Sequence, residues 1–151
     1  VKENDFNIDF IKKVNFEAKD DENSVILSGT HNGYLLKYKK ICKRTLIISK
    51  NKELLKGEDT IISTKSAIKK NFYHLRFHLM PEISTTITKN KKSIIIKTKK
   101  NNIWMFKSNK EMVIEKSIFV RNDIANETTQ IVVSGVTSSL NTKIQWSLEK
   151  I

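Results

Sequence analysis

Apolar and polar residues alternate with a period of two along much of this 151-residue chain. The clearest example is Asn71–Pro81, which reads NFYHLRFHLMP. Its odd-numbered positions from 73 to 79 are apolar, and positions 74, 76 and 78 are His, Arg and His. Strict alternation that stops at the only proline of the chain predicts a half-buried β-strand, with a His-Arg-His row on its other face.

A helix is the alternative for this stretch, because it would make His74 and His78 neighbours able to share a metal ion. On a strand the two residues lie about 13 Å apart, at ~3.3 Å per residue, which is too far for one zinc ion. The aromatic content and the terminating Pro81 favour the strand.

Other short segments have the same character, and polar turns separate them. They are Val14–Ala18, Ser24–Thr30, Lys43–Ser49, Thr60–Ser63, Ile83–Thr88, Ser93–Thr98, Ile103–Lys107, Met112–Val120, Thr129–Ser134 and Lys143–Leu148. Turn signals every 8–12 residues, without a convincing long helix, predict an all-β fold. We expect a two-sheet antiparallel β-sandwich, rich in meanders and with few or no helices.

Two polar steps between these segments carry turn signals. Asn32-Gly33 is predicted to supply the positive φ of a tight turn. Glu58-Asp59, after Gly57, is interpreted as a turn cap before the next strand rather than as a catalytic carboxylate pair.

Length and charge limit the possible roles of the chain. One domain over residues 1–151 is expected, with 1–12 as an irregular lead-in. The chain begins at Val1 without an initiator Met or a signal peptide, so we expect it to be the C-terminal part of a longer protein. A net charge of +12 suits an anionic partner, or else a solvated, lysine-rich surface.

Few residues offer chemistry. The chain has three His and the single cysteine Cys42, which excludes an internal disulfide or a multi-cysteine metal site. No run approaches the ~18–20 apolar residues of a membrane span. None of the common nucleophile-elbow, P-loop, zincin or dinucleotide motifs occurs. The residue types alone therefore describe a basic all-β domain in which no active site is visible.

Several short motifs follow one another in an order typical of a known family. They are His31–Tyr34, Lys43–Leu46, Leu55–Asp59, Arg76–Pro81, Gln130–Gly135 and Ile144–Trp146. Over about residues 25–150 this order resembles the C-terminal β-domain of heparinase II/III-like polysaccharide lyases. Lys43 stands where the family often has Arg. Met80 stands where the family often has His, so any role of that His is lost here.

The resemblance implies an α/α-toroid followed by a β-sandwich, and cleavage of uronate-containing polysaccharides by β-elimination. In that family the catalytic Tyr and the neutralising Asn or His lie on the toroid, and a further catalytic His and any metal ligands lie upstream of the matching region. We therefore assign no catalytic residue, no metal ligand and no cofactor. This chain alone is expected to be inactive, with a structural or cleft-framing role, and the resemblance implies a periplasmic or cell-envelope location.

Five residues are candidates for contact with an acidic polysaccharide: His31, Tyr34, Arg44, Arg76 and His78. Arg and His would face carboxylates, with Arg bidentate, and Tyr would stack on a sugar. The structural alternative is that they form hydrogen bonds within a turn, pack on a sheet or form cross-strand pairs. Trp104 and Trp146 are predicted to be core residues rather than sugar platforms.

Two other functions are weighed beside the lyase domain. A stand-alone basic carbohydrate-binding module for acidic glycans is the main alternative. Nucleic-acid binding ranks last, because an aromatic pair of the RRM type and a basic helix are both missing from the sequence. The expected protein partners are the N-terminal toroid domain of the parent chain and a second copy bound through an exposed sheet; no membrane partner is expected.

Overall fold

The computed structural model describes residues 14–64, 69–138 and 140–151, and their fold is all-β. The strands are β1 (Val14–Asp20), β2 (Ser24–His31), β3 (Lys40–Ser49), β4 (Leu54–Ser63), β5 (Phe72–His78), β6 (Ser84–Ile87), β7 (Ser93–Lys97), β8 (Ile103–Ser108), β9 (Met112–Arg121), β10 (Ile124–Val136) and β11 (Thr142–Lys150). In the described ranges the one helix is the short α1 (Leu35–Tyr38). The predicted lead-in over residues 1–12 lies outside the described residues.

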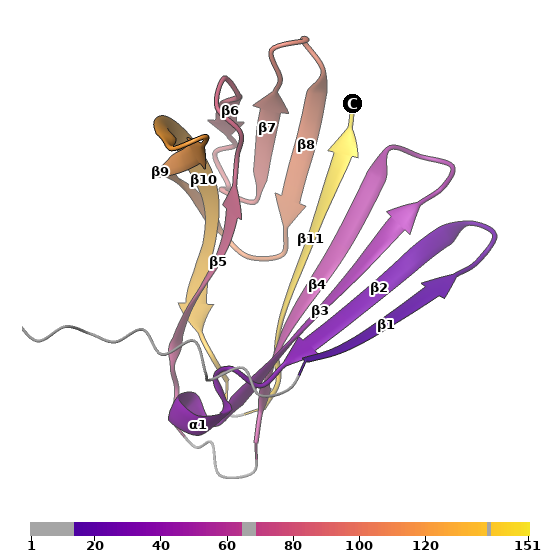
Figure 1. The fold of residues 1–151 in the computed structure, drawn as a ribbon, viewed down its shortest axis with the longest axis vertical. Coiled ribbons are helices and arrows are strands. Elements are labelled where there is room, and N and C mark those ends of the chain that lie inside the picture. The colour runs from indigo at the N-terminus through magenta and orange to yellow at the C-terminus, as the bar shows by residue number, and fades with distance from the viewer. Residues whose placement is uncertain (1–13, 65–68, 139) are drawn as a thin grey trace, which may run out of the picture.

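The strands form two antiparallel sheets, which confirms the predicted two-sheet architecture. The large sheet has the order β1-β2-β3-β4-β11-β8-β7-β6, and the small sheet has the order β5-β10-β9. Figure 1 shows the small sheet facing the middle of the large one, while the β1–β2 hairpin fans out beyond it. The C-terminal strand β11 lies between β4 and β8 and so joins the N-terminal strands to the later meander.

The core lies where the two sheets face each other. Its buried residues are Ile94, Ile96, Phe106, Met112, Ile131, Val133, Ile144 and Trp146. They come from alternate positions of their strands, as the period of two requires. The prediction that Trp146 is a core residue is confirmed, and Trp104 packs half-buried against the same core.

The interpretation of Glu58-Asp59 as a turn cap is wrong. β4 begins at Leu54, so both residues lie inside a strand that pairs with β3 and β11. Gly57 looked like a turn residue, yet its role is to leave room. A Cβ atom there would lie 2.2 Å from the ring of Trp146.

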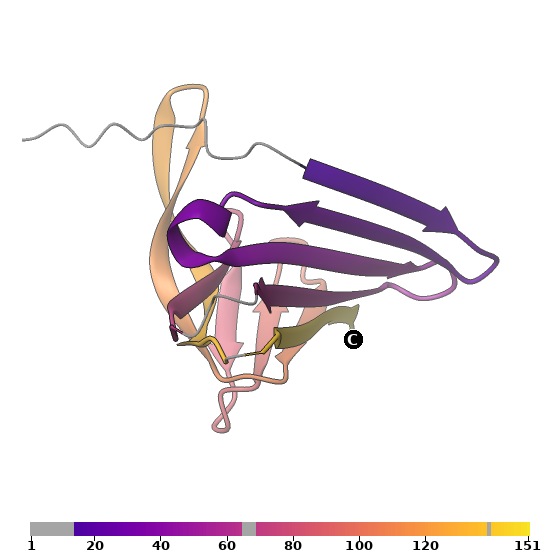
Figure 2. The ribbon, with the colours of Figure 1, turned by 90° about the horizontal axis from the view of Figure 1, so that it is seen from below.

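The predicted positive φ at Asn32-Gly33 is also wrong, since no described glycine has a positive φ. The chain instead enters α1, where the N–H of Leu35 donates to the carbonyl of Asn32 at 2.9 Å. The left-handed residue is Lys39, with φ of 55°, which ends the helix. Figure 2 shows α1 at the open end of the sandwich, between the small sheet and the β1–β2 side.

Candidate functional site

A cleft of about 700 Å³ opens between the two sheets beside α1. One wall comes from β2, α1, β3 and β4, and the other from β5 and the residue before it, Asn71. We call this space the α1 cleft. It is a candidate site because small-molecule sites are usually concave, with apolar walls and a few convergent polar groups.

Three of the five predicted site residues, His31, Tyr34 and Arg44, line the α1 cleft. Arg76 and His78 project from the exposed face of β5 and do not line it, whereas His74 of the same row does. There Arg76 Nη1 donates to Glu115 Oε2 at 2.6 Å, and His78 Nδ1 lies 2.9 Å from Ser117 Oγ. His74 Nδ1 lies 2.8 Å from Ser134 Oγ, so each residue of the His-Arg-His row makes a polar contact within its own sheet.

Aromatic side chains form the rim of the α1 cleft. The ring centroids of His31 and Tyr34 are 5.6 Å apart, and those of Tyr34 and Tyr38 are 6.2 Å apart. The N–H of Gly33 donates to His31 Nδ1 at 3.3 Å, so neutral His31 carries its proton on Nε2 and can donate from there. On the opposite wall Phe72 is 84% exposed.

Arg44 is held by a network that joins both sheets. Its Nε and Nη2 atoms donate to Oδ1 and Oδ2 of Asp59 at 2.7 and 3.2 Å, and Trp146 Nε1 donates to Asp59 Oδ2 at 2.8 Å. The guanidinium also lies 5.7 Å from the ring centroid of Phe77 and 5.9 Å from that of Trp146. With Gly57, these residues of four separate motifs form one group, which we call the motif cluster.

Lys40 and Asn71 are cleft residues that sequence reasoning missed. Lys40 is only 2% exposed, and its Nζ donates to Ser63 Oγ at 2.6 Å. The Oδ1 atom of Asn71 is buried without a hydrogen-bond partner in the described part of the chain. Lys40 was missed because this strand, β3, was expected to begin at Lys43, whereas it begins at Lys40. Alternate residues of a strand share a face, so Lys40 and Cys42 lie on the same face as Arg44.

Burial raises the pKa of two further groups in the cleft. It raises the pKa of the Cys42 thiol, with a smaller contribution from the charge of Asp59, and it raises the pKa of the Tyr73 hydroxyl. Both groups are therefore protonated at neutral pH, so neither is activated as a nucleophile or base. The cleft offers aromatic surface, hydrogen-bond donors and one buried cation, and these groups suit ligand binding.

Across residues 14–64, 69–138 and 140–151, no group of three or more His, Cys, Asp or Glu side chains could hold a metal ion. No helix in the described chain is long and apolar enough to cross a membrane.

Comparison with known proteins identifies relatives of this domain. The family model "Heparinase II/III-like, C-terminal" matches residues 9–147. The heparan sulfate lyase HepC from Pedobacter heparinus has a similar fold, with a TM-score of 0.77 at 12% identity over 91% of this chain and 22% of the lyase. A heparinase III structure gives a TM-score of 0.71 at 12% identity over 93% of this chain and 22% of that one.

The chain thus spans 22% of the length of the lyases that it matches in structure. No curated protein matches it by sequence. At this low identity the likeness to the solved lyases shows a shared fold.

Proposed function

Because the chain belongs to the heparinase II/III-like C-terminal domain family, we propose that it is the β-sandwich domain of a larger polysaccharide lyase. The whole enzyme would cleave uronate-containing acidic polysaccharides by β-elimination. In that reaction a base removes the C5 proton while the uronate carboxylate is neutralised, and the 4-O leaving group is protonated. This domain would support the catalytic part and frame its cleft without supplying a catalytic group.

The observation that carries the structural role is the motif cluster. Both side-chain oxygens of Asp59 accept hydrogen bonds from Arg44, and one also accepts from Trp146. The Phe77 ring packs edge-on against Trp146 at 4.8 Å and so links β5 of the small sheet to β11 of the large one. Residues of the family motifs are thus engaged with one another, which favours holding the fold together over contacting substrate.

An exposed apolar surface supports a partner domain. Strand β1 carries Val14 and Phe16, which are 66% and 67% exposed. Figure 1 shows β1 at the outer edge of the large sheet, away from the small sheet. Contiguous exposed apolar surface often marks an interface with another domain or subunit. The rest of the parent lyase, with its toroid, is the proposed occupant of this surface; a second copy of the chain is the competing one.

The test is a lyase assay that records the 235-nm absorbance of the unsaturated product. It would be run on this chain alone and on the longer protein that contains it, with heparan sulfate, heparin, alginate and hyaluronan as substrates. We expect product only from the longer protein. Activity of the isolated chain would contradict the non-catalytic role, and an inactive longer protein on every substrate would contradict the lyase assignment.

A stand-alone binding module for acidic glycans is the second candidate, and the buried cation in the α1 cleft favours it. It predicts that the isolated chain binds heparin or alginate, and that binding weakens steeply as salt increases. Preference for DNA over a polysaccharide of equal charge would instead favour nucleic-acid binding.

A further inference from the structure

We propose that the α1 cleft binds one acidic sugar residue, whose anionic group lies on the Lys40 ammonium and whose ring lies against Tyr34 and Tyr38. The choice of a sugar rests on the proposed function. The need for an anion rests on Lys40 alone.

Within the described ranges, Lys40 is a buried cation that no carboxylate compensates. Its ammonium has three donors, and Ser63 Oγ accepts from one of them. That hydroxyl is neutral and itself donates to the carbonyl of Leu140 at 2.9 Å. No carboxylate in the described part of the chain forms an ion pair with Lys40. A buried charge is unfavourable unless it is paired, so this position suits an anion brought by a ligand.

The Asp59 carboxylate, which also lines the cleft, already has hydrogen-bond partners. Asp59 accepts from both Arg44 and Trp146, and its side chain is 15% exposed. Arg44 and Asp59 therefore largely cancel each other's charge. The other cations that line the cleft are Lys43, which is exposed, and Lys40, which is buried; Lys40 is the one with which we expect an incoming anion to pair.

Asn71 indicates that the ligand carries a hydroxyl as well as a charge. The backbone of Asn71 is held by Thr137: the Asn71 N–H donates to Thr137 Oγ1 at 3.0 Å, and the Thr137 N–H donates to the Asn71 carbonyl at 2.8 Å. The side-chain Oδ1 has no donor in the described chain, and an unmet buried acceptor is unfavourable. A simple inorganic anion would leave it unmet, whereas a sugar hydroxyl would satisfy it.

The rim supplies the surface for a ring. Tyr34 and Tyr38 are 50% and 39% exposed, and an exposed Tyr offers an apolar face together with a polar hydroxyl. His31 Nε2–H adds a donor beside them. The volume of about 700 Å³ lies in the usual range of small-ligand sites. The combination of aromatic rim, buried cation and orphan acceptor matches an acidic sugar.

The test is calorimetric titration of the chain with defined tetrasaccharides at low salt. An unsulfated glucuronate–N-acetylglucosamine tetrasaccharide and its sulfated counterpart distinguish a carboxylate from a sulfate as the bound group, and fully N-acetylated chitotetraose is the uncharged control. We expect at least one anionic ligand to bind at least 10-fold more tightly than chitotetraose. Equal affinity for the neutral sugar would overturn the proposal.

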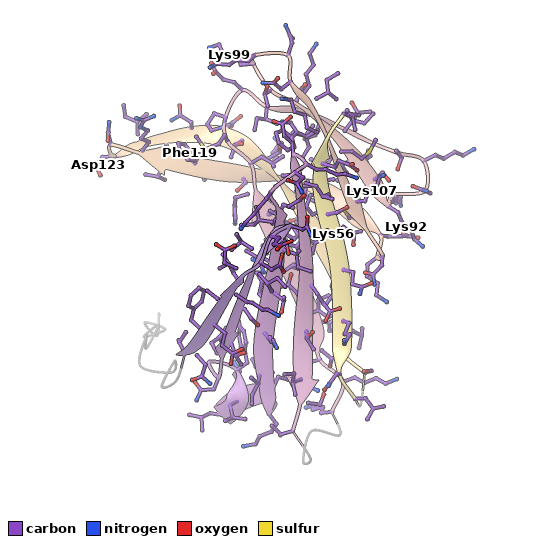
Figure 3. The ribbon with its side chains drawn as sticks, turned by 90° about the vertical axis from the view of Figure 1, so that its right-hand side faces the viewer. Lys56, Lys92, Lys99, Lys107, Phe119 and Asp123 are labelled. Carbon is purple, nitrogen blue, oxygen red and sulfur yellow. The ribbon has the colours of Figure 1, made fainter. Side chains whose placement is uncertain are left out.

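Matched lysine variants locate the site. Lys40→Met keeps the length of the side chain and removes its charge, and we expect binding to weaken about 10- to 100-fold. Lys107→Met removes an exposed lysine from the opposite face of the large sheet (Figure 3), and we expect no change. Asn71→Ala should weaken binding about fivefold, since one neutral hydrogen bond is lost. Equal losses in the two lysine variants would show charge attraction without a site and overturn the proposal.

Two readouts separate a binding role of Lys40 from a structural one. Without ligand, the Lys40→Met variant should have the same melting temperature as the wild type or a higher one, because the substitution removes a buried ammonium that has no charged partner among the described residues. Amide NMR shifts in the wild type should change at Gly33, Tyr34 and Asn71 on adding the sugar. A lowered melting temperature together with shifts confined to other surfaces would refute the inference. Binding without lyase activity in the longer protein would refute the proposed function alone.

Discussion

Replacing Gly57 by alanine places a methyl group where the indole of Trp146 lies. A Cβ atom at this position would be 2.2 Å from both Cε2 and Cζ2 of the ring and 2.8 Å from Cδ2. The ring cannot easily move away, because it stacks on Phe106 at 5.7 Å and packs edge-on against Phe77 at 4.8 Å. Its N–H is also bonded to Asp59 at 2.8 Å.

The cost follows from these contacts. Overpacking a core typically costs about 1–3 kcal/mol. A displaced indole also loses its hydrogen bond to a carboxylate, and a bond to a charged group contributes about 1.5–3 kcal/mol. We therefore expect Gly57→Ala to lower the free energy of unfolding by about 3–5 kcal/mol. Urea unfolding followed by far-UV circular dichroism measures this value.

Gly29 is the matched control, since it also lies inside a strand but has no atom within 4 Å of an added Cβ. Gly29→Ala should be neutral or stabilise by up to about 1 kcal/mol, because alanine has less freedom in the unfolded chain. Gly57→Ala should also cost much less in a Trp146→Leu background. The reasoning is refuted if Gly57→Ala stays within about 1 kcal/mol of the wild type, or costs the same in both backgrounds.

Three further predictions concern charge and surface. Arg44→Met should lower the free energy of unfolding by about 1–3 kcal/mol, because it leaves the Asp59 carboxylate without its bidentate partner; an equal cost in an Asp59→Asn background, measured by urea unfolding, would contradict this. Hydrogen bonds, first from Gln145, lower the pKa of Glu58 below its ordinary 4.5. The contribution of the Glu58 carboxylate to the free energy of unfolding is therefore complete above pH 4.5, and it is lost as the pH falls through the lower pKa of the folded state. It is under about 1 kcal/mol because the side chain is 31% exposed. Glu58→Gln should flatten the stability profile below pH 4.5 in acid titrations, and an unchanged slope would argue against this role. Phe16→Ser should reduce self-association of the isolated chain in sedimentation velocity; wild-type chain that stays monomeric at high concentration would count against self-association through this face.

Local pattern was enough to predict the strands, because side chains on a strand alternate between faces and each short segment records that alternation by itself. The alternation of Phe72–His78 correctly placed Tyr73 and Leu75 inward and the His-Arg-His row outward. Lysine and glycine inside strands misled the boundaries. β4 was expected to start late because Gly57 suggested a turn, and its reason for being glycine is a ring from β11, 89 residues later in the chain (146 − 57).

Sheet order and the α1 cleft were decided by tertiary structure. Nothing in the periodicity of Thr142–Lys150 says that it inserts between β4 and β8, since any strand with one apolar face could pair there. The sequence by itself determined the fold class, the outward face of β5 and the family motifs. Only the folded chain brought Lys40, Asn71 and Tyr34 to one cleft and paired Arg76 with Glu115 of β9. The physical reason is that alternation is a property of neighbours along the chain, whereas a site depends on which strands pair across it.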